Sequence, residues 1–257
     1  TLPTLSMEHR RVQAPDLLDK AIKVAEAIKD NRALAYANGY KAQLYEQENR
    51  FQEAVWLTQK ALSYAHNPNT VEINQNAISN ENCVPNTQSQ NCLIETGFRS
   101  DPKLLYSLEW QLGRFLKQTK QAQRQVIIDT YLRAKQQLSF VREKFRCGGG
   151  SHFLAEAEKF SGELTELFLR QAAQAPVAQK QDILRKAIDS IEFLKETELQ
   201  NYFHDVCVTK VKDKLKWQEK SIPYNTAIFY PVILDDCLED CLELLVIFPD
   251  KSIKQFE

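Results

Sequence analysis

Apolar residues recur at helical spacing through most of the chain. In residues 15–29, small and aliphatic side chains form one stripe with a period of about 3.6 residues: Leu18, Ala21, Ile22, Ala25 and Ile28. Pro15 stands where the first turn of a helix tolerates proline, so the pattern predicts a helix over 15–29. The same spacing predicts helices over 32–48 and 51–66. The short turn at 48–50 between them requires an antiparallel hairpin.

Small residues mark the predicted contact between these two helices. Ala42 on the first helix, with Ala54 and Ala61 on the second, lets the two backbones approach closely. The rings of Tyr45 and Phe51 then fill the space where the helices splay apart. This pattern resembles a tetratricopeptide repeat, a helix pair that recurs about every 34 residues.

The repeat pattern extends in both directions from this hairpin. One period before Ala61 stands Ala27, again followed by an aliphatic residue, so 15–29 is interpreted as the second helix of a preceding repeat. Further along, SLEWQLGRFLKQ (107–118) resembles the first helix of a repeat, and IIDTYLRAKQQL (127–138) resembles its second helix. We therefore expect stacked antiparallel helix hairpins.

Helices continue towards the C-terminus after one interruption. Residues 67–100 are rich in Asn, Gln, Ser and Pro, which predicts an insertion with one more helix over 70–79 and a loop over 80–100. The glycines of CGGG (147–150) are expected to end a helix over 121–146. Three further helices are predicted over 151–174, 177–203 and 207–217. The middle one carries an apolar stripe of Ile183, Ala187, Ile191 and Leu194.

The C-terminal part of the chain changes from helical to strand periodicity. TAIFYPVIL (226–234) and CLELLVIF (241–248) are too apolar for strands with one face in water, and SIKQF (252–256) alternates like a third strand. Pro231 cannot donate a ladder hydrogen bond, so we expect it at an edge or a bulge. PDKS (249–252) predicts a hairpin turn. Because so apolar a sheet needs cover on both faces, we expect further strands in a longer parent protein.

Together these patterns predict a mainly α-helical protein. Its fold class is an antiparallel helix-hairpin α-solenoid that ends in a short β-hairpin or meander. Four segments are expected: helix hairpins over 1–66, an insertion over 67–100, hairpins and long helices over 101–217, and the first strands of a further domain over 218–257.

Composition and charge narrow the function classes. Hydrophobic residues make up 43% of the 257 residues and the formal net charge is −1, so a core is expected and a nucleic-acid partner is not. The sequence contains no run of about eighteen apolar residues, so no membrane span is predicted. Cys83 and Cys92 flank a polar, turn-rich segment and form either a disulfide or two free thiols. A disulfide would indicate an exported protein, whereas free thiols would fit the cytoplasm.

The junction between helices and strands resembles that of a known family. The segments AIDSIEFLKETELQNYFHDVCV (187–208) and NTAIFYPVILDD…LELLVIFPD are similar to the junction in bacterial CHAT proteins. In these proteins, tetratricopeptide repeats precede a caspase-like, separase-related cysteine peptidase domain. The family's first strands correspond to 227–234 and 242–247. The intervening DDCLEDC (235–241) is longer than the family's usual tight turn.

The resemblance implies a regulatory role for this chain. The family's catalytic His and Cys each follow an apolar strand deep in the peptidase domain. None of the four histidines has that context: His9, His66, His152 and His204. We therefore expect the protein-binding repeat region of a CHAT-domain protein, with no catalytic dyad of its own and no cofactor. The alternatives are part of a cysteine peptidase that is active only with its missing C-terminal domain, and a structural spacer.

The repeat pattern also identifies candidate binding residues. The helix over 107–118 is expected to line a concave groove, with three side chains projecting from it: Trp110, Arg114 and Lys117. The equivalent positions of the earlier repeat are Tyr36, Gln43 and Glu46. An aromatic ring flanked by two cations favours an acidic, partly apolar segment of a protein or peptide ligand.

Two further patterns leave alternatives open. Residues 109–146 carry nine Lys or Arg against three Asp or Glu, which indicates either a solvated face balanced by acidic neighbours or a site for an acidic partner. A second group has a spacing compatible with a zinc site, a disulfide or free cysteines: His204, Cys207, Cys237 and Cys241. The zinc spacing is unusual, so no metal site is predicted.

Overall fold

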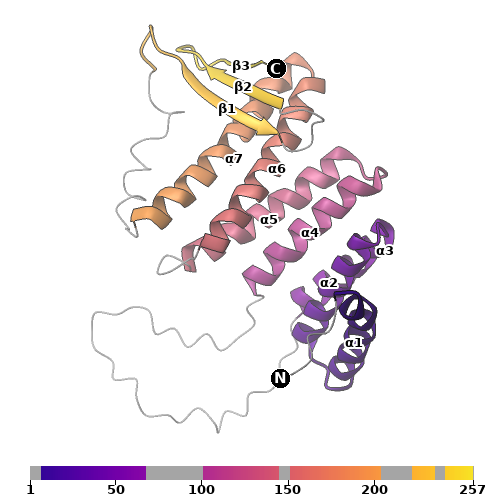
Figure 1. Ribbon diagram of the computed structural model, residues 1–257. Helices are drawn as coiled ribbons and strands as arrows, with labels where there is room; N and C mark the ends of the chain where they lie inside the picture. The colour runs from indigo at the N-terminus through magenta and orange to yellow at the C-terminus, as the bar shows by residue number, and fades with distance from the viewer. Residues whose placement is uncertain (1–6, 68–100, 145–150, 204–221, 235–240, 257) are drawn as a thin grey trace, which may run out of the picture. The chain divides into compact units, whose positions relative to one another are not determined.

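The computed structural model describes residues 7–67, 101–144, 151–203, 222–234 and 241–256. The described chain is mainly helical, with a three-stranded sheet after the last helix (Figure 1), which confirms the predicted fold class. It divides into two compact units. The first comprises 1–122 with 133–137, and the second comprises 123–132 with 138–257.

The first unit opens with α1 (Met7–Ala27), α2 (Asn31–Gln47) and α3 (Phe51–His66). α2 and α3 pack as the predicted hairpin, and α1 packs on α2. Asn49 adopts a left-handed φ of 57° in the tight turn between α2 and α3, a conformation that asparagine tolerates. The three alanines proposed to bring the helices together are all fully buried: Ala42, Ala54 and Ala61.

Helix α1 differs from its prediction. It begins at Met7, so Pro15 lies inside the helix and not in its first turn. The prediction treated the proline as a start signal, whereas the polar residues before it also favour helix. Ala25 of the predicted stripe is buried, but Ile28 lies beyond the helix end with 66% of its surface exposed. The main contact of α1 is with α2, and the other residues of the stripe are half-buried (Leu18 and Ile22) or exposed (Ala21).

Helix α4 (Pro102–Thr119) packs against α3. Asp101 caps its N-terminus by accepting hydrogen bonds from the Lys103 and Leu104 backbone N–H groups at 3.0 and 3.4 Å. Its leucines join α2 and α3 in one cluster of buried residues: Ala35, Ala61, Leu62, Ala65, Leu104, Leu105, Leu108 and Leu112. Helix α5 (Arg124–Lys144) follows.

The second unit contains the helix pair α6 (Ser151–Gln174) and α7 (Val177–Phe203). Large buried side chains fill its interior: Phe160, Leu164, Phe168, Leu184 and Ile188. Ile183 and Ala187 of the predicted α7 stripe are buried, whereas Ile191 and Leu194 are half-buried. Across the described residues, every helix is too short or too polar for a membrane span.

The sheet is an antiparallel meander in the order β1 (Ile228–Leu234), β2 (Cys241–Ile247) and β3 (Ile253–Phe256). β1 packs against α6 and β3 packs against α7. Pro231 lies on the edge strand β1, as predicted. The predicted turn at 249–252 is also confirmed, because Phe248 N–H donates to the Ser252 carbonyl at 3.0 Å and Lys251 has a φ of 65°.

Other predictions fall outside the described residues. They are the helices over 70–79 and 207–217, the loop over 80–100, the glycine turn at 147–150 and the segment between β1 and β2.

Candidate functional site

Helices α2 and α4 are in close contact at Gly39. A Cβ atom at this position would lie 2.8 Å from Cδ2 of Leu108, well inside van der Waals contact. Glycine therefore lets the backbone of α2 lie against a buried leucine of α4. This contact sets the distance between the outward faces of the two helices.

A buried amide fixes the same contact from the α4 side. Gln111 donates to the Gly39 carbonyl at 3.1 Å and to the Thr58 hydroxyl at 3.0 Å, so it ties α4 to both α2 and α3. Gln43 in turn donates to the Gln111 side-chain oxygen at 3.1 Å. Because a buried amide without partners would be costly, this network favours one alignment of α4 on the hairpin.

Residues predicted to bind a partner meet across this contact. The Arg114 guanidinium lies 3.5 Å from the Glu46 carboxylate, and these side chains are 27% and 32% exposed. Arg114 also lies over the Trp110 ring, 5.2 Å from its centroid, and Lys117 follows one turn later on the same helix face. The structure thus brings Gln43 and Glu46 of α2 together with Trp110 and Arg114 of α4.

Tyr36, the remaining predicted residue, belongs to a second polar cluster on the same two helices. Its hydroxyl donates to Asp101 at 3.2 Å, and Arg32 forms an ion pair with Asp101 at 2.8 Å. Burial raises the pKa of the Tyr36 phenol, so the phenol stays neutral at physiological pH. Tyr40 stacks on Tyr36 with ring centroids 6.3 Å apart, and about half of its surface is exposed.

We call this region the α2–α4 surface and define it by eight residues: Arg32, Tyr36, Tyr40, Gln43, Glu46, Trp110, Arg114 and Lys117. Sequence reasoning missed Arg32, Tyr40, and the supporting residues Asp101 and Gln111. Asp before Pro102 is a recognisable helix-cap signal, although the helix predicted over 107–118 did not make use of it. Its second role, holding α2 through Arg32, has no local sequence signal.

The α2–α4 surface carries a cationic excess. Arg32, Arg114 and Lys117 contribute three positive charges, whereas Glu46 and the adjacent Asp101 contribute two negative charges, which leaves one positive charge. Lys103 is exposed on the same face of α4 and raises the excess to two. Aromatic rings lie between these charges, so the surface combines apolar contact with attraction for anions.

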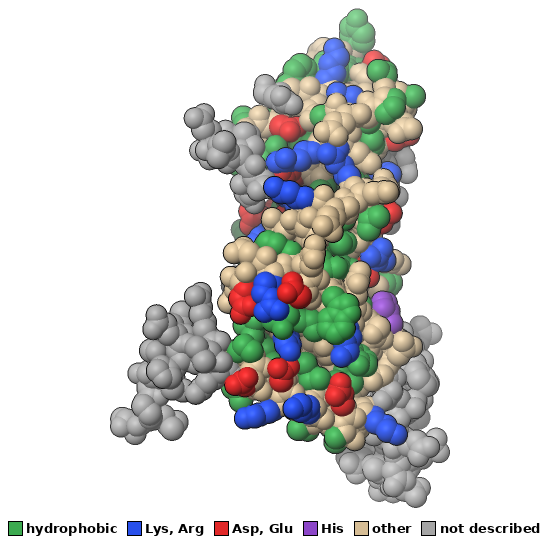
Figure 2. All heavy atoms as spheres, turned by 90° about the vertical axis from the view of Figure 1, so that its right-hand side faces the viewer, with side chains coloured by type: hydrophobic (Ala, Val, Ile, Leu, Met, Phe, Trp, Pro, Cys, Tyr) green, Lys and Arg blue, Asp and Glu red, His purple; other side chains and the backbone are tan. Residues whose placement is uncertain are grey.

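Two cations of the basic run over 109–146 pair with acidic residues of their own unit. Within the first unit Arg133 pairs with the buried Glu109 at 2.9 Å, and within the second unit Arg142 pairs with Glu196 at 3.1 Å. On the face drawn in Figure 2, acidic and basic side chains lie interspersed with apolar ones. For Arg133 and Arg142, these contacts favour charges that are balanced within the protein over a site for an acidic partner.

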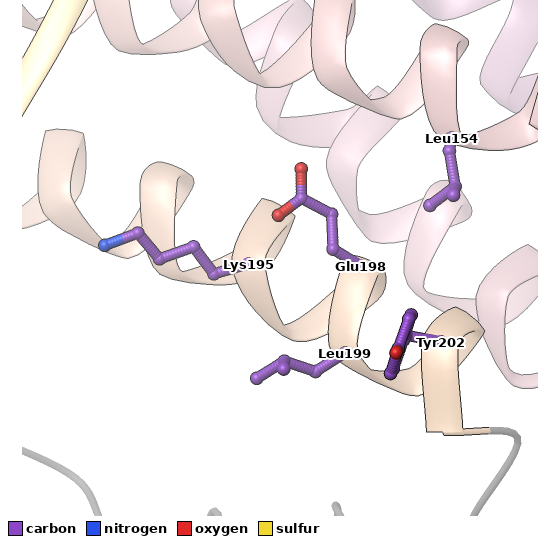
Figure 3. A pocket seen from close by; sticks show the side chains of 5 residues that line it. All are labelled: Leu154, Lys195, Glu198, Leu199 and Tyr202. Carbon is purple, nitrogen blue, oxygen red and sulfur yellow. The ribbon is translucent and has the colours of Figure 1, made fainter.

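A separate pocket of about 520 Å³ opens beside the C-terminal end of α7. Figure 3 shows its lining: Leu154 from α6, and Lys195, Glu198, Leu199 and Tyr202 from α7. The Lys195 ammonium lies 3.6 Å from Glu192 and 4.4 Å from the Tyr230 ring centroid, so nearby groups of the protein already contact this charge. The pocket wall is mostly carbon and offers a surface for apolar contact.

The cysteine and metal predictions remain open. Cys83, Cys92, Cys207, Cys237 and His204 lie outside the described residues, so the disulfide and zinc alternatives stay predictions. Within the described part of the chain, no group of three His, Cys, Asp or Glu side chains could hold a metal ion.

Comparison with known proteins gave no relative. No protein-family model, no curated protein and no solved structure matches this chain.

Proposed function

We propose that this chain is a protein-binding module whose α2–α4 surface receives an acidic, partly apolar segment of another protein. The main support for the proposal is the contact of Arg114 with both Glu46 and Trp110, because it joins the candidate binding residues of α2 to those of α4. Without that continuity, each helix would present a few scattered surface residues.

The arrangement supports peptide binding in a specific way. Tyr36, Tyr40 and Trp110 present large rings that lose little side-chain freedom on binding. Arg114 is already oriented by Glu46, so its guanidinium enters a complex with little loss of conformational entropy. The rings would provide apolar contact and the cationic excess would select an acidic sequence.

The resemblance to CHAT proteins supports a wider proposal. In a parent chain of that kind, occupancy of the α2–α4 surface would regulate an attached caspase-like cysteine peptidase domain. The present chain would be the regulatory repeat region and not the enzyme.

The binding proposal is tested with a defined peptide probe. We would measure, by fluorescence anisotropy, binding of a labelled twelve-residue peptide of Glu, Leu and Phe, and of the same peptide with every Glu replaced by Lys. The Glu peptide should bind at least tenfold more tightly, with an affinity that falls as salt rises.

Two charge-reversal variants locate the site. Lys117→Glu should weaken the Glu peptide at least tenfold, whereas Lys23→Glu, at an exposed position of α1, removes the same charge elsewhere and should change the affinity less than twofold. Equal losses in both variants would show a general charge effect and would refute the site. An affinity for the Glu peptide that is unchanged in both variants would also refute the site.

A further inference from the structure

The three-stranded sheet presents several exposed apolar side chains on one of its faces. The register pairs Phe229 with Val246 and Ile233 with Leu242, and it pairs Leu244 with Phe256. Because side chains alternate along a strand and paired residues share a face, all six lie on one side of the sheet. Four of them are exposed, at 59% for Phe229, 73% for Ile233, 57% for Leu242 and 47% for Phe256, whereas Leu244 is half-buried and Val246 is buried.

The opposite face of the sheet is already buried. Tyr230, Val232 and Leu234 of β1 point inward, as do Leu245 of β2 and Ile253 of β3. β1 packs on α6 and β3 on α7 (Figure 1), so this side has its cover within the unit. Strands with one wet face normally alternate apolar and polar residues, whereas β1 is apolar throughout. Such a sequence is typical of strands buried on both sides.

The edges of the sheet are poorer sites for association than this face. Pro231 on the β1 edge lacks an N–H group to donate to a further strand. The opposite edge, β3, has only four residues. Short strands and prolines are the features by which proteins suppress edge pairing.

The size of the exposed face indicates what can cover it. With about 200 Å² for each large side chain, the four exposed residues present roughly 500 Å², at the upper end of patches found on monomers. Pro231, Leu244 and the rim residue Lys254 raise this to about 600–700 Å². Two such faces together would bury about 1,200–1,400 Å², which reaches the lower range of specific interfaces.

We propose that two copies of this chain associate through this face, sheet against sheet, about a two-fold axis. The face is apolar, and Lys254 is its one charged side chain among the described residues, so it is complementary to itself. The small area predicts a dimer that dissociates at micromolar concentration. This proposal concerns the second unit and does not depend on the peptide-binding function of the first.

Sedimentation velocity of the whole chain between about 1 and 100 µM tests the dimer. The wild type should change from monomer to dimer over this range. The double variant Ile233→Thr with Leu242→Thr should raise the dimer Kd at least a hundredfold, because it removes the most exposed apolar pair of the face. Threonine keeps the strand preference of both positions, and circular dichroism would confirm the fold.

The matched control is Val177→Thr, which removes an exposed apolar side chain at the start of α7 and should leave the dimer unchanged. A wild-type chain that stays monomeric at 100 µM would overturn the proposal and assign the face to a different occupant, such as another polypeptide. A dimer that persists in the double variant would place the interface elsewhere and would also overturn it.

Discussion

Replacing Gly39 by alanine tests whether α2 and α4 are packed as closely as the structure shows. The new Cβ would lie 2.8 Å from Cδ2 of Leu108, and Leu108 is buried within the cluster of α2, α3 and α4. Either the leucine or the whole of α4 must move. Because α4 carries Trp110 and Arg114, such a movement would also separate the two halves of the α2–α4 surface.

The expected magnitude comes from two opposing effects. Alanine favours helix over glycine by about 1 kcal/mol, whereas overpacking of a buried contact costs about 1–3 kcal/mol. Gly39→Ala should therefore leave the free energy of unfolding unchanged or reduce it by up to about 2 kcal/mol. Gly162→Ala in α6 is the matched control, since a Cβ there meets nothing within 4 Å. That variant should gain about 0.5–1 kcal/mol.

Urea denaturation gives both values. In a Trp217→Phe background, tryptophan fluorescence would follow the first unit, which contains Trp56 and Trp110, and circular dichroism would follow the whole chain. The two glycine variants should differ by about 1–3 kcal/mol in their change of unfolding free energy.

A double-mutant cycle identifies the cause. In a Leu108→Ala background the clash is gone, so adding Gly39→Ala should stabilise the protein by about 1 kcal/mol. If Gly39→Ala stabilises the wild type as much as Gly162→Ala does, α2 and α4 are not in close contact, and the site assembled on them fails.

Three further predictions concern individual contacts. Reversing both charges of the Glu46–Arg114 pair should recover about 0.5–1 kcal/mol of the stability lost by the two single reversals, measured by a double-mutant cycle. Asp101→Ala should cost about 1–2 kcal/mol in urea denaturation, whereas Asp101→Asn keeps the helix cap and should cost less than half as much. Burial, and to a smaller extent the Glu192 carboxylate, raises the pKa of the Tyr230 phenol above its ordinary value. The neutral Tyr230 side chain therefore stabilises the fold fully below pH ~10, and this stabilisation is lost as pH rises above that value. Between pH 9 and 11, the free energy of unfolding should fall less in the Tyr230→Phe variant than in the wild type. An equal fall in both proteins would contradict this reasoning.

Local patterns predicted the hairpin of α2 and α3 well. The burial of Ala42, Ala54 and Ala61 follows from small residues at positions where two helices must nest, and that information lies within one short stretch of sequence. The strands were equally readable, because their apolar runs and the turn at 249–252 are local features. Helices α2 and α3 and the three strands begin and end within a few residues of the predicted limits.

Long-range contacts were not readable in the same way. Arg32 and Asp101 pair across the segment 67–100, and the contact of Gly39 with Leu108 also spans that segment. No periodicity in a single sequence specifies which turn of α4 meets which turn of α2. The repeat pattern predicted that two sets of side chains would share a surface, but Gln111 and Asp101 determine how they meet.

The error in α1 has a physical explanation. A proline can start a helix or lie within one. The residues before Pro15 favour helix, so α1 begins at Met7 and the proline lies inside it. Similarly, the stripe containing Ile28 looked like a core because its spacing is helical. Periodicity shows which side chains share a face, but it cannot show whether a neighbour covers that face.

The most direct test of the α2–α4 surface is a titration followed by the indole N–H signals of tryptophan in ¹H–¹⁵N NMR. Trp110 lies on the surface, whereas Trp56 is 60% exposed on α3 and serves as an internal reference. Addition of the Glu, Leu and Phe peptide should shift the Trp110 signal in a saturable manner and leave the Trp56 signal in place. A Trp110 signal that does not move at millimolar peptide, or a saturable shift of Trp56 alone, would contradict the proposed binding surface.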